Sequence, residues 1–292
     1  MERTVSLEKG KLFICGTPMG NLEDISKRVL KTLKKADIIA AEDTRRTGQL
    51  LNYFDIKNRM ISYHEHNEKR RAEEILGRLQ SGENIALVSD AGMPGISDPG
   101  QIITKMAVKN GIEVIPVPGP TAFVSALVVS GFDLSRFVFL GFIPRSTKER
   151  DGFIDEISLE EKTAVFYESP YRLLSTLKEF ADYSSELAER DIMVARELSK
   201  IHEEKIYGNT IEIIEKLNSR EIKGEVVVVV SGRKKIKEEE EGWENLSILE
   251  HIKLLMNNGF SKKEAIKKVA DLRDLPKSEV YRVAVAIKID KQ

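Results

Sequence analysis

Short apolar runs alternate with amphipathic stretches from residue 12 to residue 117, and this alternation limits the possible folds more than any other feature. Four runs have the length and composition of buried strands: Leu12–Cys15, Ile38–Ala41, Ile85–Ser89 and Ile112–Val117. Between them apolar residues recur at helical spacing. Parallel strands need long crossover connections, for which helices serve. The sequence therefore predicts an α/β unit with a largely parallel sheet and helices on its faces.

Turn and capping residues predict where three of these helices begin or end. Asp24 is the expected N-cap of a helix whose apolar face includes Ile25 and Leu33. Gly82 is expected to end a helix that runs through Ala72 and Leu79. A third helix, through residues 102–107, is expected to stop before Gly111.

A second series of elements follows the Pro- and Gly-rich stretch 116–120. Its expected strands and helices are Phe137–Leu140, Thr163–Tyr167, Pro170–Ala181, Ile192–Ala195, Thr210–Leu217 and Val226–Val230. The charged run Arg233–Glu241 lacks apolar periodicity and is expected to be a linker. Helical patterns then cover Leu246–Met256, Lys262–Leu272 and Lys277–Lys288. We expect two α/β domains, residues 11–118 and 119–233, and a small all-α helix-turn-helix module, residues 242–292.

Composition narrows the class of protein. No apolar run approaches the roughly 18–20 residues of a membrane span, and the N-terminal residues lack the apolar core of a signal peptide. Cys15 is the single cysteine, which excludes an internal disulfide and a thiolate metal cluster, and its apolar neighbours favour burial over reactivity. These features favour a cytoplasmic protein. The Cys and His spacings do not suggest a metal site.

Charge is unevenly distributed along the chain. The net charge is −1, yet residues 246–292 contain ten Lys and Arg against six Asp and Glu, a net charge of +4. A basic module attached to a mildly acidic body suggests an additional contact with nucleic acid, although a solvated helical surface would have the same composition. Tyr281 is expected to pack in the module's core with Val280, Val283 and Ala284, the alternative being a stack on an unpaired base.

Two loops have the residues of a ligand site. The stretch 16–21 (GTPMGN) follows the first strand, but Pro18 and Asn21 stand where a dinucleotide-binding fingerprint needs glycines. The stretch 89–100 (SDAGMPGISDPG) is longer than a simple connector, which needs about 2–6 residues. Its glycines permit close approach of a ligand, and Asp90 and Asp98 accept hydrogen bonds from amines or hydroxyls. Because ligands of α/β sheets bind beyond the carboxyl ends of strands, we expect a ligand here.

A third corner, PGPTA at residues 118–122, leads into an apolar helix. Thr121 stands where its hydroxyl can cap that helix or meet a ligand, and the cap is the expected role.

Taken together, nine segments resemble a known family. They are GTPMGNLEDISKRVL (16–30), EDTRRTGQLL (42–51), HEHNE (64–68), SDAGMPGISDPG (89–100), PGPTA (118–122), GFIPR (141–145), YESPYRL (167–173), ARELSK (195–200) and KGEVVVVVSG (223–232). In this order they resemble the tetrapyrrole-methylase-like superfamily of S-adenosylmethionine-dependent methyltransferases. The EDTR, HNE and RELSK blocks are similar to those of the ribosomal RNA small subunit methyltransferase I family. Thr121 departs from the serine that is usual there.

This resemblance implies a fold, a reaction and a set of donor contacts. Two α/β domains of the tetrapyrrole methylase type would hold S-adenosylmethionine in the cleft between them, and the protein would be a homodimer. The reaction would be 2′-O-methylation of a cytidine in the decoding region of 16S rRNA, within the small ribosomal subunit. The donor-binding residues implied are Pro18, Asp90, Gly92, Met93, Thr121, Ala122, Tyr167, Glu168, Arg196 and Gly224.

The chemistry of methyl transfer suggests what the remaining blocks do. The enzyme must mainly align a ribose oxygen with the methyl carbon, and a general base assists because a ribose hydroxyl is a poor nucleophile. The candidate bases are Asp43, Glu42 and His66, among which the sequence does not choose. The expected contacts with RNA phosphates are Arg45, Arg46, Arg145, Lys200, Lys277 and Arg282.

Other classes of protein share parts of this pattern. A related methyltransferase would act on a tetrapyrrole or a protein side chain, but the basic module and the EDTR and HNE blocks argue against it. A dinucleotide-dependent oxidoreductase would explain the alternation but not the failed fingerprint. A DNA-binding regulator with a small-molecule sensor domain would explain the helix-turn-helix, but the last helix has few base-reading side chains.

Overall fold

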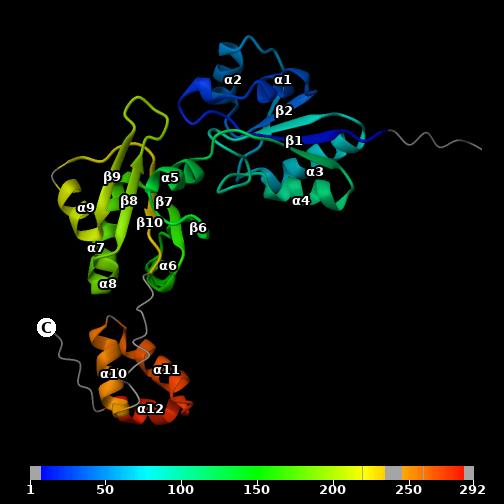
Figure 1. The fold of residues 1–292 in the computed structure, drawn as a ribbon. Helices are drawn as coiled ribbons and strands as arrows, with labels where there is room; N and C mark the ends of the chain where they lie inside the picture. The colour runs from blue at the N-terminus through cyan, green and yellow to red at the C-terminus, as the bar shows by residue number, and fades with distance from the viewer. Residues whose placement is uncertain (1–7, 219, 234–244, 259, 286–292) are drawn as a thin grey trace, which may run out of the picture.

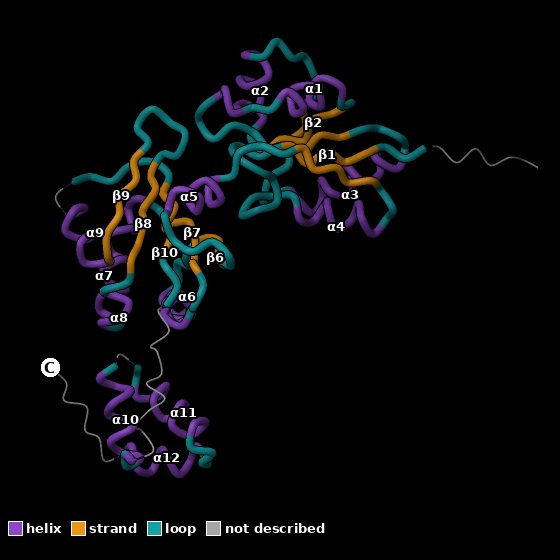
Figure 2. Tube along the Cα trace, viewed as in Figure 1, coloured by secondary structure: helices purple, strands orange, loops and turns teal. Residues whose placement is uncertain are grey.

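The chain is described here from a computed structural model that covers residues 8–218, 220–233, 245–258 and 260–285. Figures 1 and 2 show two α/β units, each built on its own five-stranded sheet, followed by a separate group of helices. This arrangement confirms the predicted fold class. No helix in the described ranges is long and apolar enough to cross a membrane.

The first sheet is parallel throughout and has the strand order β3-β2-β4-β1-β5. Its strands are β1 (Lys11–Cys15), β2 (Ile38–Ala41), β3 (Met60–Ser62), β4 (Ile85–Val88) and β5 (Glu113–Val117). Its helices are α1 (Lys27–Lys35), α2 (Thr44–Tyr53), α3 (Glu68–Gln80) and α4 (Gln101–Lys109). Alternate residues of one strand face opposite sides, so Ile39 packs toward α1 and α2 whereas Ala40 packs toward α3 and α4. Helices therefore cover both faces of the first sheet, as predicted.

The beginning of α1 differs from the prediction. Asp24 ends a short 3₁₀ turn, Leu22–Asp24, and Ser26 is the N-cap because its hydroxyl accepts a hydrogen bond from the Val29 amide at 3.1 Å. Gly82 and Gly111 follow the ends of α3 and α4 with positive φ, as expected. Two elements were not predicted from the sequence: β3, which has only three residues, and α2, whose first turns are polar.

The second sheet has the order β6-β7-β10-β8-β9 and is mainly antiparallel, a pairing that was not predicted. Only β6 and β7 run parallel. The strands are β6 (Phe137–Phe142), β7 (Thr163–Glu168), β8 (Asp191–Arg196), β9 (Glu204–Asn209) and β10 (Val226–Val230). Helix α5 (Ala122–Ser130) packs on one face. The other face carries α6 (Thr147–Leu159), α7 (Pro170–Tyr183), α8 (Ser185–Ala188) and α9 (Thr210–Leu217). Edge strand β9 was not predicted, because Ile206 is the one buried residue of this strand.

The C-terminal helices α10 (Ile248–Asn257), α11 (Lys262–Leu272) and α12 (Lys277–Ala284) form a small core of their own. Val280 and Ala284 are buried in it, as predicted. Tyr281 is exposed, so the prediction that it packs in this core is wrong. The expected linker lies outside the described residues from position 234 onward, and Lys288 does too.

Candidate functional site

Three loops converge at the carboxyl edge of the first sheet, those after β1, β4 and β5. Thr17 and Gly92 exchange backbone hydrogen bonds of 2.9 and 3.0 Å, and the Thr17 hydroxyl donates to the Ser89 carbonyl at 3.0 Å. Gly16 lies directly against Gly119, since a Cβ added to Gly16 would stand 2.7 Å from the Gly119 Cα. The glycines of the first and third loops therefore allow backbone to pack on backbone. This contact places the three loops side by side.

Acidic side chains connect this edge to β2 and the start of α2. Glu42 accepts a hydrogen bond from the Asp90 amide at 3.1 Å, and Asp90 accepts one from the Asp43 amide at the same distance. Asp90 also forms an ion pair with Arg46 at 3.3 Å. Burial raises the pKa of Glu42, and the neighbouring charge of Asp90 adds to the effect. These two hydrogen bonds hold the carboxylates of Glu42 and Asp90 close together at the edge of the first sheet.

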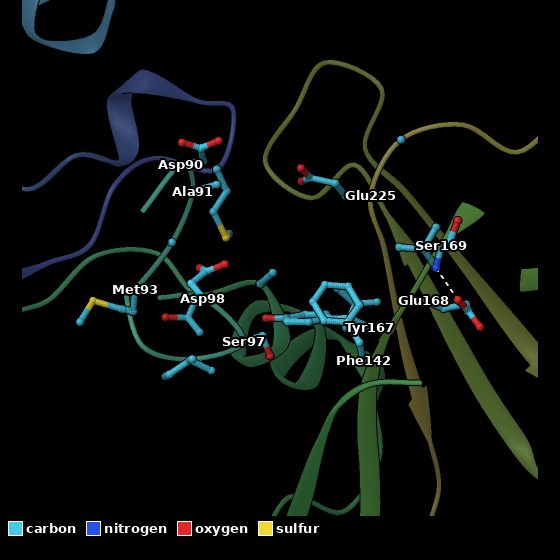
Figure 3. Close-up of a pocket in the computed structure, with 18 of the residues that line it drawn as sticks. Asp90, Ala91, Met93, Ser97, Asp98, Phe142, Tyr167, Glu168, Ser169 and Glu225 are labelled. Atoms are coloured by element: carbon cyan, nitrogen blue, oxygen red, sulfur yellow. Dashed lines mark hydrogen bonds between the residues drawn. The ribbon is translucent and has the colours of Figure 1, made fainter. Parts of the chain in front are cut away.

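A cavity of about 370 Å³ lies between these loops and the edge of the second sheet. On the second-sheet side its wall includes the rings of Phe142 and Tyr167, which Figure 3 shows together with Glu225. Val226 and Val227 add to the apolar part of this wall. On the loop side its wall contains Glu42, Asp90, Gly92, Met93, Asp98 and Thr121. Cavities that bind small molecules combine a mostly apolar surface with a few polar groups, over about 300–1,000 Å³. The cavity, which we call the interdomain cavity, has both properties.

Asp98 is the most perturbed acid of the interdomain cavity. Burial, and then the charges of Glu42, Asp90 and Glu225, raise its pKa to about 7. Burial also raises the pKa of Tyr167 to about 12. Figure 3 shows Asp98 among the lining residues, with Glu225 on the opposite wall. A bound cation or hydrogen-bond donor would relieve this concentration of negative charge.

Most of the expected donor-binding residues meet in this cavity. Those that line it are Asp90, Gly92, Met93, Thr121, Ala122, Tyr167, Glu168 and Gly224. Thr121 occupies the N-cap position of α5, but its side chain makes no capping hydrogen bond, so the expected capping role is wrong. Pro18 lines a neighbouring cavity instead. Arg196 lines neither, and pairs with Glu204 at 3.1 Å.

Glu168 is among the residues that line the cavity, but its carboxylate is buried and bonds to other parts of the second domain. The side chain is fully buried and accepts hydrogen bonds from the Thr176 hydroxyl at 2.6 Å and the Ser169 amide. It also pairs with Arg172 at 2.7 Å. Figure 3 shows the bond to Ser169. The carboxylate thus anchors the first turns of α7 behind the cavity wall.

Position 224 requires glycine, both because of its backbone conformation and because there is no space for a side chain. Its φ of +90° is one that L side chains rarely adopt, and an added Cβ would stand 2.3 Å from the Glu197 carboxyl carbon. The tight turn before β10 brings Glu225 into the cavity wall.

A second cavity of about 520 Å³ adjoins the first and shares with it Met19, Arg46, Asp90, Ala91 and Glu225. Its other walls come from the loop after β1, from α2 and from Lys200. We call it the α2 cavity.

Of the three candidate bases, one lines a cavity and two do not. Glu42 lines the interdomain cavity. Asp43 lines neither cavity; its carboxylate caps α2 through the Arg45 amide at 2.8 Å and pairs with the Arg45 guanidinium, which holds its pKa well below the usual range. His66 also lies outside both cavities, 82% exposed and 3.4 Å from Glu65.

The expected RNA contacts fall into three places. Arg46 and Lys200 line the α2 cavity, whereas Arg45 is exposed beside it and paired with Asp43. Arg145 is exposed after β6. Lys277 and Arg282 are exposed on α12.

Phe142 and Glu225 belong to the interdomain cavity and were not singled out from the sequence. The only signal was position, since each stands at one end of an apolar strand. Within the described ranges, no three His, Cys, Asp or Glu side chains are grouped to hold a metal ion.

Comparison with known proteins gives three kinds of similarity. The family model Tetrapyrrole (Corrin/Porphyrin) Methylases matches residues 11–215. "Ribosomal RNA small subunit methyltransferase I" of Halalkalibacterium halodurans is 45% identical over 94% of this chain and 95% of its own length. The protein of that name from Thermotoga maritima is 48% identical over 77% of this chain and 99% of its own length. Among solved structures, uroporphyrin-III C-methyltransferase of Thermus thermophilus in complex with S-adenyl homocysteine is 15% identical, with a TM-score of 0.53 over 76% of this chain and 97% of that one. Diphthine synthase is 14% identical, with a TM-score of 0.59 over 76% and 90%.

Proposed function

Because this chain belongs to the ribosomal RNA small subunit methyltransferase I family, within the tetrapyrrole methylases, we propose that it transfers a methyl group from S-adenosylmethionine to RNA of the small ribosomal subunit. We further propose that the acceptor is the 2′ hydroxyl of a cytidine in the decoding region of 16S rRNA. The observation that carries the proposal is the interdomain cavity, where eight of the ten expected donor-binding residues meet.

The residues of the interdomain cavity fit the chemical parts of the donor. Phe142, Tyr167, Val226 and Val227 offer the apolar and aromatic surface that an adenine ring needs. The opposite wall is acidic, which suits the ammonium and sulfonium groups of the donor and its ribose hydroxyls. When bound, the donor supplies the methyl carbon and a thioether leaving group. The loops after β1, β4 and β5 hold these walls in fixed positions through their mutual backbone contacts.

The chain's contribution to the reaction is alignment and, secondarily, proton removal. The new carbon–oxygen bond forms as the carbon–sulfur bond breaks, so the acceptor oxygen must lie in line with that bond at about 3–3.5 Å from the methyl carbon. The hydroxyl proton passes to a carboxylate or to water. Of the expected bases, Glu42 lines the interdomain cavity, and its raised pKa makes it the better proton acceptor. Asp98, with a pKa of about 7, is a second acceptor in the same cavity.

The C-terminal helices have a supporting role in this proposal. We propose that residues 242–292 form an RNA-contacting module in which Lys277 and Arg282 meet phosphates, and that residues 11–118 and 119–233 are the two donor-binding domains. The residues that line the interdomain cavity all lie between positions 19 and 227, outside this module. The module is therefore expected to increase affinity for the substrate rather than to build the catalytic centre.

A homodimer located in the bacterial cytoplasm completes the proposal. The location follows from the ribosomal substrate. In the described residues, helix α5 exposes Val124 and Val128, an apolar surface that suits association of two chains. Sedimentation velocity of the purified chain measures this directly, and a monomer at micromolar concentration would contradict the dimer.

The function is tested by offering labelled methyl donor with naked 16S rRNA, with intact small subunits lacking the modification and with a tetrapyrrole. The expected result is label in 2′-O-methylcytidine from one of the two RNA substrates. Label on a base or on the tetrapyrrole would contradict the proposal, as would the absence of label in RNA. Binding of NAD in place of S-adenosylmethionine, or a gel shift on duplex DNA alone, would favour the other classes of protein.

A further inference from the structure

The α2 cavity opens beside the interdomain cavity and has a different chemical character. Three of its residues come from one face of α2, namely Arg46, Gln49 and Tyr53, because spacings of three and four residues bring side chains together on a helix. Pro18 in the loop after β1 and Lys200 in the loop after β8 also line this cavity. The cavity thus offers two cations, an amide and an aromatic ring, together with the carboxylates of Asp90 and Glu225, and the cations, amide and ring are the groups that suit a nucleotide.

Tyr53 is placed as a stacking platform. It is the last residue of α2 and is 68% exposed, although it lines the α2 cavity. Its ring meets that of Phe54 edge to face, with centroids 4.9 Å apart, and Phe54 packs against the core beneath the first sheet. Phe54 therefore supports the ring of Tyr53, most of which stays open to solvent. An exposed, supported aromatic ring is the feature on which unpaired bases of RNA stack.

The two cations of the α2 cavity pair with acidic neighbours that differ in burial. Arg46 pairs with Asp90 at 3.3 Å, and Lys200 pairs with Glu197 at 2.8 Å and with Glu225 at 3.0 Å. Arg46 and Glu225 are largely solvent-exposed, and exposed pairs of this kind contribute only about 0–1 kcal/mol, whereas Lys200 and Glu197 are both mostly buried. Phosphate oxygens, like carboxylates, form charge-assisted hydrogen bonds with such cations. A phosphate can therefore replace Asp90 beside Arg46 and Glu225 beside Lys200, while Lys200 stays paired with Glu197.

The wall that the two cavities share determines where an acceptor would meet the donor. Met19, Asp90 and Ala91 line both cavities. A nucleotide in the α2 cavity would therefore have its ribose near this wall, next to the interdomain cavity. Enzymes that react with a base turn the nucleotide out of its stack and hold the base in a pocket, and the same arrangement would bring a ribose hydroxyl to the donor here.

Building on the proposed function, we infer that the α2 cavity binds the target nucleotide, turned out of the RNA, with its base on Tyr53 and its flanking phosphates beside Arg46 and Lys200. Gln49 faces the same space and is available to read the edge of the base. The alternative is that the α2 cavity belongs to the donor site, in which case changes at Tyr53 would weaken donor binding.

The first test compares Tyr53→Ala and Tyr53→Phe with a control, Tyr183→Ala. Tyr183 is 46% exposed and, like Tyr53, is the last residue of a helix, but it lies on α7 and lines neither cavity. Tyr53→Ala is expected to raise the KM for small subunits about 5- to 150-fold, the range of one lost base–aromatic stack. The Kd for S-adenosylmethionine, measured by calorimetry, should stay unchanged. Tyr53→Phe keeps the ring and should keep the KM, as should Tyr183→Ala.

Each other outcome overturns the inference. A wild-type KM for Tyr53→Ala would show that no base stacks there, and an equal loss in Tyr53→Phe would show that the ring is not the contact. A weakened donor Kd would assign the cavity to the donor.

A second test separates failure of this inference from failure of the proposed function. RNA carrying 4-thiouridine at the target position is irradiated with the wild-type protein, and the attached peptide is identified by mass spectrometry. Attachment within residues 46–53 supports the inference even when the position of methylation differs from the proposed one. Attachment to α10–α12 alone would overturn it. The labelled-donor experiment with wild-type protein tests the function independently.

Discussion

Asp98 provides the sharpest test of the electrostatics of the interdomain cavity. It lies in the loop after β4 and lines the cavity, and its main neighbours of the same charge are Glu42, Asp90 and Glu225. Burial and these charges raise its pKa from 3.8 to about 7. The substitution Asp98→Asn keeps the shape of the side chain and removes its charge. The difference in the free energy of unfolding between the wild type and Asp98→Asn, followed across pH, therefore measures the cost of ionising Asp98.

The magnitude follows from the pKa. Each tenfold change in proton affinity is worth about 1.36 kcal/mol, so raising the pKa from 3.8 to about 7 corresponds to roughly 4 kcal/mol. Asp98 is only partly buried and water screens its charge, so about 2 kcal/mol is the better expectation. The folded protein binds this proton more tightly than the unfolded chain does. The free energy of unfolding of the wild type should therefore fall, relative to Asp98→Asn, as the pH rises from about 4 to about 7.

Donor binding gives a second measurement of the same group. A cation bound beside Asp98 favours its ionised form, so binding of S-adenosylmethionine near pH 7 should release a proton from the wild type. Calorimetry in two buffers of different ionisation enthalpy measures this release, and Asp98→Asn should lack it. Donor affinity of the wild type should rise between pH 6 and pH 8, and the variant should bind about tenfold more weakly at pH 8. Equal proton release and equal pH profiles in the two proteins would refute the reasoning.

Three further predictions test the framework around the cavity. Gly224→Ala forces a side chain into a left-handed conformation against Glu197 and should cost about 1–3 kcal/mol by thermal unfolding. The control Gly152→Ala, in a helix with open space around it, should stabilise by about 0.5–1 kcal/mol; equal effects would contradict the strain argument. Glu168→Ala removes the buried partner of Arg172 and Thr176 and should cost about 2–4 kcal/mol in urea unfolding, whereas a loss below 1 kcal/mol would show that the pair is dispensable. Deleting residues 242–292 should leave the donor Kd unchanged and reduce methylation of small subunits; full activity of the truncated chain would exclude a role for the module in substrate binding.

Much of the fold followed from local pattern. The run of five valines in β10 is buried on both faces of a central strand, and β2 has the same character, so both were predicted at their observed bounds. Helix α9 was likewise predicted at its observed bounds, and the structure shows that the Asn209 side chain caps it. Strands β3 and β9 lie at sheet edges, where few side chains are buried, and the sequence therefore contained no comparable signal for them.

The residue types of the site were also visible in the sequence, because glycines, prolines and aspartates gather directly after buried strands. Which of those side chains face the cavity was decided only by tertiary structure. Glu168 turns to Arg172 and Thr176, Arg196 turns to Glu204, and His66 points to solvent. The physical reason is that a charged side chain is held by the strongest partner within reach. That partner is set by how strands pair and how the two sheets meet, which no local stretch of sequence records.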